Sequence, residues 1–194
     1  MKFFRLWMCG YTRPTALVDG LLTKRGYWWG IGAQTLRATL DSLLEYLPVA
    51  LAGRVPPEAP LLPIPPGRYY WFLVFTGPLI ILVETLFGAV LMYAILRFLG
   101  RRSNLGAIVN LLGMSGLLVG PVIVAWDWAW FAIGFYDQYF LGITHLLLVL
   151  WSVFIVTLGL KRGFEVPVPL GVVLNIVGIL AAMTLAVPLM RSPF

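Results

Sequence analysis

Long hydrophobic runs separated by short polar breaks dominate the pattern of this chain. Four runs, near residues 71–96, 105–126, 138–160 and 168–190, each have the ~20 residues that a membrane-spanning helix needs. Because the bilayer interior offers backbone groups no water to bond with, a segment that crosses it is expected to be a helix. The pattern therefore predicts an all-α fold, a polytopic membrane helix bundle.

A fifth segment, residues 27–47, is apolar but interrupted by charges. Arg37, Asp41 and Glu45 recur every four residues, so on a helix they share one face, where Arg37 and Asp41 can pair. Two alternatives fit this pattern. The segment either crosses the bilayer with its polar stripe against other helices, or lies flat at the membrane interface.

The distribution of basic residues favours the crossing alternative. Loops on the cytosolic side of a membrane protein carry the excess of Lys and Arg. If residues 27–47 cross, one side of the membrane holds Lys2, Arg5, Arg13, Lys24, Arg25, Arg97, Arg101, Arg102, Lys161 and Arg162, and the other only Arg54, Arg68 and Arg191. If they do not cross, this bias is lost. We predict about five spans, with the N-terminus cytosolic and the C-terminus outside.

The segments before and after residues 27–47 differ in character. Residues 1–26 are basic and apolar without a cleavable signal pattern, so we expect a cytosolic or interfacial segment. Residues 27–194 form the transmembrane domain, and residues 49–68 within it are rich in proline, which predicts a stiff outer loop. In the first segment, the side chains expected in lipid are Phe3, Phe4, Leu6 and Trp7.

Composition agrees with a membrane protein and excludes several functions. Only 11% of residues are charged and 60% are hydrophobic, with a mean hydropathy of +0.91, whereas soluble domains carry about 25% charged residues. The net charge of +6 lies mainly in the short breaks, so it indicates membrane orientation and not nucleic-acid binding. Cys9 is the single cysteine, so neither an internal disulfide nor a cysteine metal cluster can form.

Small residues in the run 105–126 predict a close helix contact. Gly116 and Gly120 form a G-x-x-x-G pattern, with Gly113 one turn before. Without apolar driving force between helices in lipid, close backbone approach at such residues holds a bundle together. We therefore predict that Gly113, Gly116 and Gly120 face another helix.

No catalytic, cofactor or metal motif is present in the sequence, so we expect no enzyme activity and no cofactor. The leading functional candidate is Glu84, because an ionisable residue midway along a span is costly. Its carboxyl group either handles protons or cations, or is a structural group bonded to a neighbouring helix. The further candidates are Arg37, which could pair with Glu84, together with Asp41, Glu45 and His145.

The order of features resembles the YIP (Rab-interacting protein) membrane domain family over about residues 13–190. The similarity lies in Leu99-Gly100-Arg101-Arg102 leading into the run that reaches Pro121, and in Leu150-Trp151-Ser152 through Leu158-Gly159-Leu160. Arg101 stands where the family usually has a second glycine, and the Asp-Leu-Tyr-Gly-Pro signature of eukaryotic members is absent. The resemblance therefore implies a prokaryotic-type member, in the plasma membrane.

Two functions follow as hypotheses. The first is a non-enzymatic scaffold or accessory subunit, with membrane lipid, other membrane proteins or a second copy of the chain as partners. The alternative is a small transporter or channel that uses Glu84 and the polar stripe. A water-filled cavity around Glu84 would favour the second.

The charge count makes a direct prediction about topology. Reporter fusions at Pro60 and Phe194 should both read external, and a fusion in the loop after Arg97 should read cytosolic, because this arrangement keeps the basic residues inside. Paired phosphatase and fluorescent-protein reporters measure both sides. A cytosolic reading at Pro60 would mean that residues 27–47 lie flat.

Overall fold

The computed structural model describes residues 2–56, 62–135 and 137–186. Across these residues the chain is helical and contains no strand, which confirms the predicted fold class. Four helices are long and apolar enough to cross a membrane. They are α5 (Tyr69–Phe98), α6 (Leu105–Ala132), α7 (Gln138–Phe164) and α8 (Val168–Ala186).

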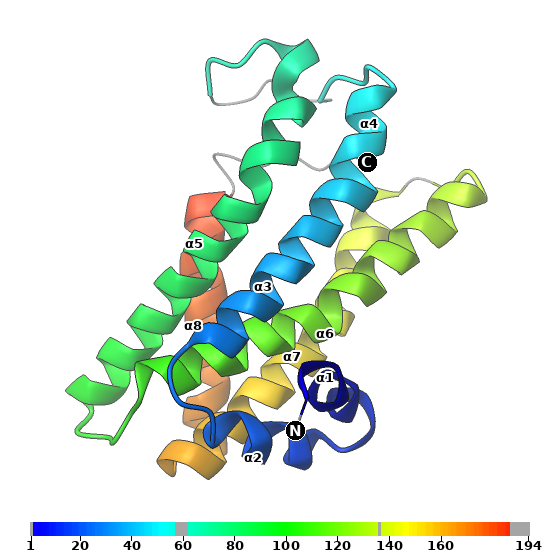
Figure 1. Ribbon diagram of the computed structural model, residues 1–194. Helices are drawn as coiled ribbons and strands as arrows, with labels where there is room; N and C mark the ends of the chain where they lie inside the picture. Colours follow the sequence, from blue (N-terminus) through cyan, green and yellow to red (C-terminus); the bar gives the residue numbers. More distant parts are fainter. Residues whose placement is uncertain (1, 57–61, 136, 187–194) are drawn as a thin grey trace.

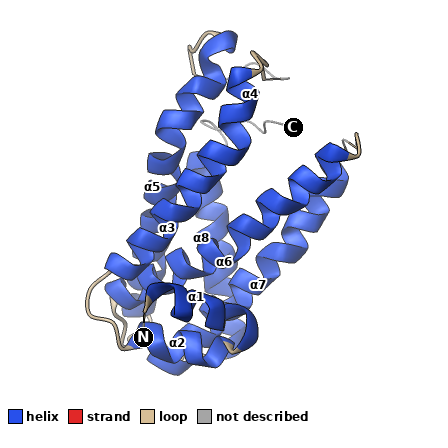
Figure 2. Cartoon of the chain, turned by 45° about the vertical axis from the view of Figure 1, so that its right-hand side comes forward, coloured by secondary structure: helices blue, strands red, loops and turns tan. Residues whose placement is uncertain are grey.

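The fifth segment is a continuous helix in three parts. It comprises α3 (Trp28–Asp41), the π-helical turn η1 (Ser42–Tyr46) and α4 (Leu47–Leu51). At about 1.5 Å per residue it extends roughly 36 Å. The segment packs against α5 and α6 and runs beside α5 along the bundle (Figures 1 and 2). This position inside the bundle is the one expected of a crossing helix and not of one lying flat across its end.

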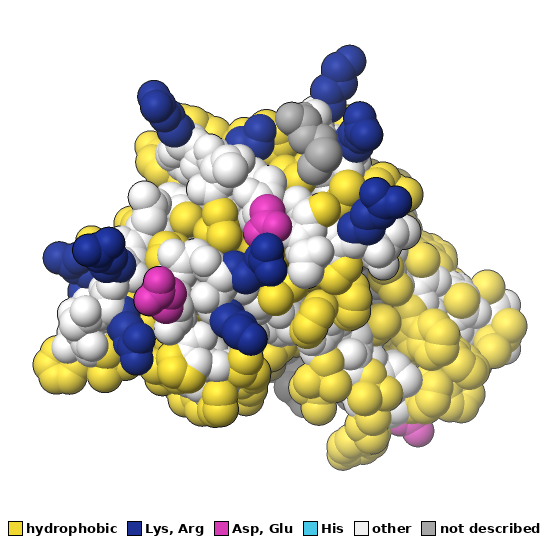
Figure 3. All heavy atoms as spheres, turned by 90° about the horizontal axis from the view of Figure 1, so that it is seen from below, with side chains coloured by type: hydrophobic (Ala, Val, Ile, Leu, Met, Phe, Trp, Pro, Cys, Tyr) yellow, Lys and Arg dark blue, Asp and Glu magenta, His cyan; other side chains and the backbone are white. Residues whose placement is uncertain are grey.

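The two ends of the bundle differ in charge. At one end lie α1 (Phe3–Thr12), α2 (Pro14–Leu22) and the loop between α5 and α6, with the last turn of α7 (Figure 1). Figure 3 views this end and shows Lys and Arg side chains spread across it. We call it the basic end and the opposite one, where α4 and α6 end, the distal end. The basic loops therefore share one end, as the charge count required.

The central helix of the bundle is α6. Its apolar window is 78% buried, against 28% or less for the other three candidate spans. The Asn104 side chain caps its start by accepting a hydrogen bond from the Ala107 N–H at 3.0 Å. The preceding helix, α5, ends at Phe98 and is followed by Gly100, whose positive φ of 70° lets the Arg101 N–H bond back to the Leu96 carbonyl at 2.9 Å.

Helices α3 and α6 make the closest backbone contact of the bundle. A Cβ added at Gly113 would collide with the Gly30 backbone, and one at Gly30 would collide with the Val109 carbonyl. Next to this contact, the buried Asn110 side chain accepts a hydrogen bond from the Gly30 N–H at 2.8 Å and donates one to the Gly26 carbonyl at 2.9 Å. Asn110 thus satisfies groups at the α3 N-terminus that the helix cannot bond itself.

Gly116 and Gly120 also face α3, but the space beside them is filled by side chains of α3 and not by its backbone. A Cβ at Gly116 would meet the Gln34 side-chain oxygen, and one at Gly120 would meet the Arg37 side chain at 2.6 Å. The prediction that these glycines face another helix is therefore confirmed. Their role differs from the one expected, because they make room for polar side chains in place of bringing two backbones together.

The N-terminal helices α1 and α2 dock onto the bundle. Leu6, Leu17 and Leu21 are fully buried in its main core. The expectation that Leu6 and Trp7 lie in lipid is wrong, because both contact α6; Phe4, by contrast, is 65% exposed. Membrane burial and protein burial give the same apolar pattern in a sequence.

At two of the prolines inside helices, Pro121 and Pro48, a tryptophan from elsewhere bonds the freed carbonyl. Pro121 has no N–H for the Leu117 carbonyl, which accepts a hydrogen bond from Trp7 Nε1 at 3.2 Å. Pro48 leaves the Leu44 carbonyl in the same position, and Trp128 Nε1 bonds it at 2.8 Å. Such pairing is needed where lipid offers no alternative donor.

The next carbonyl of α6 is bonded in a similar way. The Tyr11 hydroxyl donates to the Leu118 carbonyl at 2.6 Å. Burial raises the pKa of Tyr11 above its ordinary value, so the hydroxyl keeps its proton and stays a donor. Helix α1 is therefore fixed across the Pro121 turn of α6.

Some predicted boundaries shift. The run predicted to end near residue 126 continues as α6 to Ala132, which brings Asp127 and Trp128 inside the helix. The middle of the proline-rich loop, with Pro60, and the end of the last run, with Arg191 and Phe194, lie outside the described residues.

The glycine contacts predict a graded effect of substitution. Gly113→Ala should lower the free energy of unfolding by about 1–3 kcal/mol, because two backbones must separate. Gly116→Leu and Gly120→Leu should also destabilise, by displacing Gln34 and Arg37. Gly142→Ala is the matched control, since nothing lies within 4 Å of its Cβ position. Unfolding midpoints in detergent measure the difference, and equal midpoints for Gly113→Ala and Gly142→Ala would contradict the close contact.

The hydrogen bond from Trp7 of α1 to the Leu117 carbonyl predicts that Trp7→Phe, which keeps an aromatic ring, lowers stability. Trp7→Phe removes the indole donor and leaves the Leu117 carbonyl unpaired, which should cost about 1–3 kcal/mol. Trp28→Phe is the control, because Trp28 is 68% exposed. Thermal unfolding in detergent compares the two, and an effect no larger than that of the control would remove this role of Trp7.

Candidate functional site

A cavity of about 240 Å³ lies in the middle of the bundle. All five long helices contribute to its wall: α3, α5, α6, α7 and α8. Its volume far exceeds the ~10–15 Å³ that one water molecule needs. Its polar lining residues are Gln34, Arg37, Glu84, Thr85, Ser115, Ser152 and Asn175.

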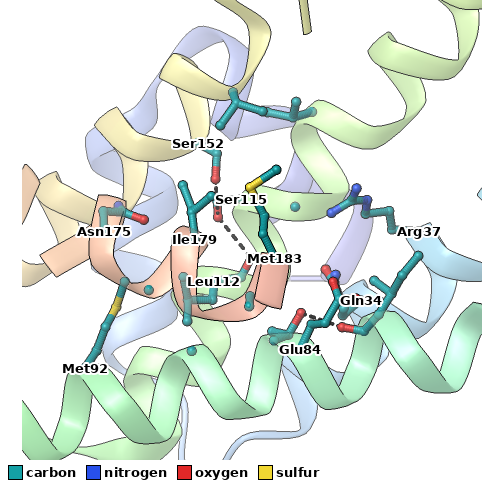
Figure 4. A pocket seen from close by; sticks show the side chains of 18 of the residues that line it. Gln34, Arg37, Glu84, Met92, Leu112, Ser115, Ser152, Asn175, Ile179 and Met183 are labelled. Atoms are coloured by element: carbon teal, nitrogen blue, oxygen red, sulfur yellow. Dashed lines mark hydrogen bonds between the residues drawn. The ribbon is translucent and has the colours of Figure 1, made fainter. Parts of the chain in front are cut away.

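Two oxygen atoms at the cavity have no hydrogen-bond partner within the described part of the chain. They are Oε1 of Glu84 and Oε1 of Gln34, and both are buried. Gln34 is only 3% exposed, so water outside the bundle does not reach it. Figure 4 shows Gln34, Arg37 and Glu84 together on one side of the cavity. Buried polar groups are normally bonded, and unpaired acceptors facing a cavity indicate a site for a donor or a cation.

Arg37 forms its ion pair with Asp41, four residues along the same helix, at 3.3 Å. This confirms the predicted pair on the stripe. The expected Arg37–Glu84 ion pair is not formed, although both residues line the cavity. Because Asp41 lies one α-helical turn after Arg37 on α3, this carboxylate takes the guanidinium.

On the opposite side of the cavity, the polar groups are hydroxyl and amide groups of α6, α7 and α8. Ser152 of α7 donates a hydrogen bond to Ser115 of α6 at 2.9 Å, and Ser115 donates to the Leu112 carbonyl at 2.9 Å. Asn175 of α8 donates to the Val153 carbonyl at 3.3 Å. These groups hold the helices together and leave their remaining lone pairs available to a bound molecule.

The predicted residues Glu45 and His145 lie outside the cavity, toward the distal end. His145 Nε2 is 2.6 Å from Asp127 Oδ1, in a pair whose side chains are 31% and 7% exposed. Glu45 interacts electrostatically with Asp41, Asp127 and Arg37. The predicted site residues therefore form two groups, one at the cavity and one beside it.

Sequence reasoning missed Gln34, Ser152 and Asp127. Gln34 precedes Arg37 by three residues, so it continues the same helix face, and extending the stripe one turn back would have found it. Asp127 looked like the start of a polar break because the tryptophans after it resemble an interface. No sequence signal pairs Asp127 with His145.

The site does not resemble a metal centre. Across the described residues, no three His, Cys, Asp or Glu side chains lie together in a way that could hold a metal ion. Cys9 is a free thiol in α1.

Comparisons of this chain with protein-family models, with curated proteins and with solved structures found no match. The resemblance to the YIP membrane domain stays a prediction from the sequence.

Proposed function

We propose that this chain is an integral membrane protein that binds a small cation in its central cavity and passes it across the membrane, as a transporter or channel. The observation that carries the proposal is the cavity at mid-bundle, lined by five helices, into which the unpaired oxygens of Glu84 and Gln34 face. Helical membrane proteins place substrate and ion sites at this depth.

The charges of the site favour a cation. Arg37 pairs with Asp41 at 3.3 Å, although its Nε makes no hydrogen bond, and no Lys or Arg forms an ion pair with Glu84 in the described residues. Among these residues, the other unpaired acceptor at the cavity is the buried side-chain oxygen of Gln34. A carboxylate together with neutral oxygens is the usual environment of a small cation or a protonated amine.

Orientation follows from the charge asymmetry. We propose that the basic end faces the cytosol of a prokaryotic cell, which places α1 and α2 inside and the distal end outside. The gathering of Lys and Arg at one end supports this orientation through the positive-inside rule (Figure 3).

A second candidate is the scaffold or accessory subunit that the YIP resemblance implies. Its support is the outward face of α7, where Leu146, Leu147 and Leu150 are each more than half exposed. Such a face suits either lipid or a neighbouring membrane protein. Oligomeric state in mild detergent, with and without Leu147→Ala, tests this candidate separately from transport.

Substitution of the cavity carboxyl tests the cation site. Purified protein in proteoliposomes is assayed for uptake of protons, radioactive sodium and radiolabelled tetramethylammonium. Glu84→Gln should reduce uptake of the transported cation at least tenfold, because the amide keeps the shape but not the charge, while Glu84→Asp should retain part of it. Glu165→Gln, an exposed carboxyl at the basic end, is the matched control.

Folding must be checked in the same samples. Size-exclusion profiles and unfolding midpoints of Glu84→Gln should match those of the unchanged protein. If uptake of a transported cation is the same in Glu84→Gln and Glu165→Gln, the carboxyl has a structural role only. If none of the three cations is taken up by the unchanged protein, the second candidate is preferred.

A further inference from the structure

We infer that a row of acidic side chains between the cavity and the distal end, ending at His145, is the water-accessible route by which the cation reaches Glu84. The row consists of Asp41, Glu45 and Asp127. The inference rests on the proposed function, since it adds an entrance to the same cavity.

The helix formed by α3 and η1 sets the direction of the row. Arg37 lines the cavity, Asp41 follows four residues later, and Glu45 follows after four more. The π-helical turn Ser42–Tyr46 widens the helix there, and a step of four residues in it still returns to nearly the same face. From the cavity residue Arg37 to Glu45 the stripe rises about 12 Å toward the distal end.

Two of the three carboxyl groups of the row are buried inside the bundle, and Glu45 is partly buried. Asp41 is 7% exposed and Asp127 is 6% exposed. Oδ1 of Asp41 has no hydrogen-bond partner within the described residues, although its Oδ2 pairs with Arg37. An unpaired carboxylate oxygen in an apolar bundle is expensive unless water or a cation reaches it.

The row continues across three helices. Glu45 of η1 lies beside α6, because Trp128 Nε1, next to Asp127, donates a hydrogen bond to the carbonyl of Leu44, next to Glu45, at 2.8 Å. Asp127 pairs with His145 of α7 at 2.6 Å. Exposure rises in the same direction, from 7% for the Asp127 side chain to 31% for that of His145. His145 therefore marks the distal mouth of the row.

The sign of the charge fits a cation and not an anion. Arg37 is committed to Asp41, and Glu45 has no ion pair with Lys or Arg in the described residues. Most other basic residues lie at the basic end, on the far side of the cavity. A row of carboxylates in a low-dielectric wall attracts cations and repels anions.

Accessibility of introduced cysteines tests the route without knowledge of the transported ion. Cys9→Ser removes the single native thiol. In that background, Glu45→Cys and, separately, His145→Cys are treated with a membrane-impermeant reagent from the distal side of sided vesicles. The route predicts reaction with the cationic trimethylammonium-ethyl methanethiosulfonate at least tenfold faster than with the anionic sulfonatoethyl reagent.

Leu146→Cys is the matched control. It is the next residue to His145, is 63% exposed on the outward face of α7, and should stay unreactive in lipid. Reagent added from the basic side should react with Glu45→Cys at least tenfold more slowly. His145→Cys keeps the test available if Glu45→Cys fails to fold, because His145 lies on a different helix, α7.

The outcomes separate the two proposals. No reaction at either cysteine in folded protein, or equal rates with the two reagents, overturns the route even if Glu84→Gln abolishes uptake. Fast cation-selective reaction with unchanged uptake in Glu84→Gln supports the route and removes Glu84 from the proposed function.

Discussion

The contact between Gly30 and Gly113 is the constraint on which the rest of the bundle depends. Because neither residue has a side chain, α3 lies directly on α6, with the Gly30 and Gly113 backbones in contact. Asn110 then completes the contact by bonding both the Gly30 N–H and the Gly26 carbonyl. In lipid, where apolar surface gives no preference for another helix, this combination of fit and hydrogen bonding supplies the specificity.

The consequences of that contact extend along α3 toward the distal end. With the two helices fixed together at Gly113, the next turns of α3 place Gln34 over Gly116 and Arg37 over Gly120. A larger residue at either glycine would push a polar side chain out of the bundle. The same small residues that bring helices together near the basic end therefore hold open the polar side of the cavity in its centre.

Sequence patterns predicted the helices and the Arg37–Asp41 pair, because each depends on residues close together in the chain. The shared end of the basic loops followed from the distribution of Lys and Arg between the runs. They did not predict the partner of each helix. Asp127 was assigned to a loop because the aromatic residues after it are typical of an interface, whereas α6 continues to Ala132. The cavity itself requires five helices at once, and no local pattern encodes it. Glu84 was identified because burying an ionisable group in the membrane costs free energy. Its neighbour Gln34 carries no charge and was not identified.

The two hydrogen bonds from α1 to α6 also bear on the order of assembly. Trp7 and Tyr11 bond carbonyls that lie 110 and 107 residues later in the chain. At about 5–20 residues per second, the ribosome needs roughly 5–20 s to make that stretch. During this interval α1 exists, but the Leu117 and Leu118 carbonyls to which it bonds have not yet been made. The surface of α1 that finally contacts α6 must remain without this partner for that time, so α1 can dock only after α6 has been made.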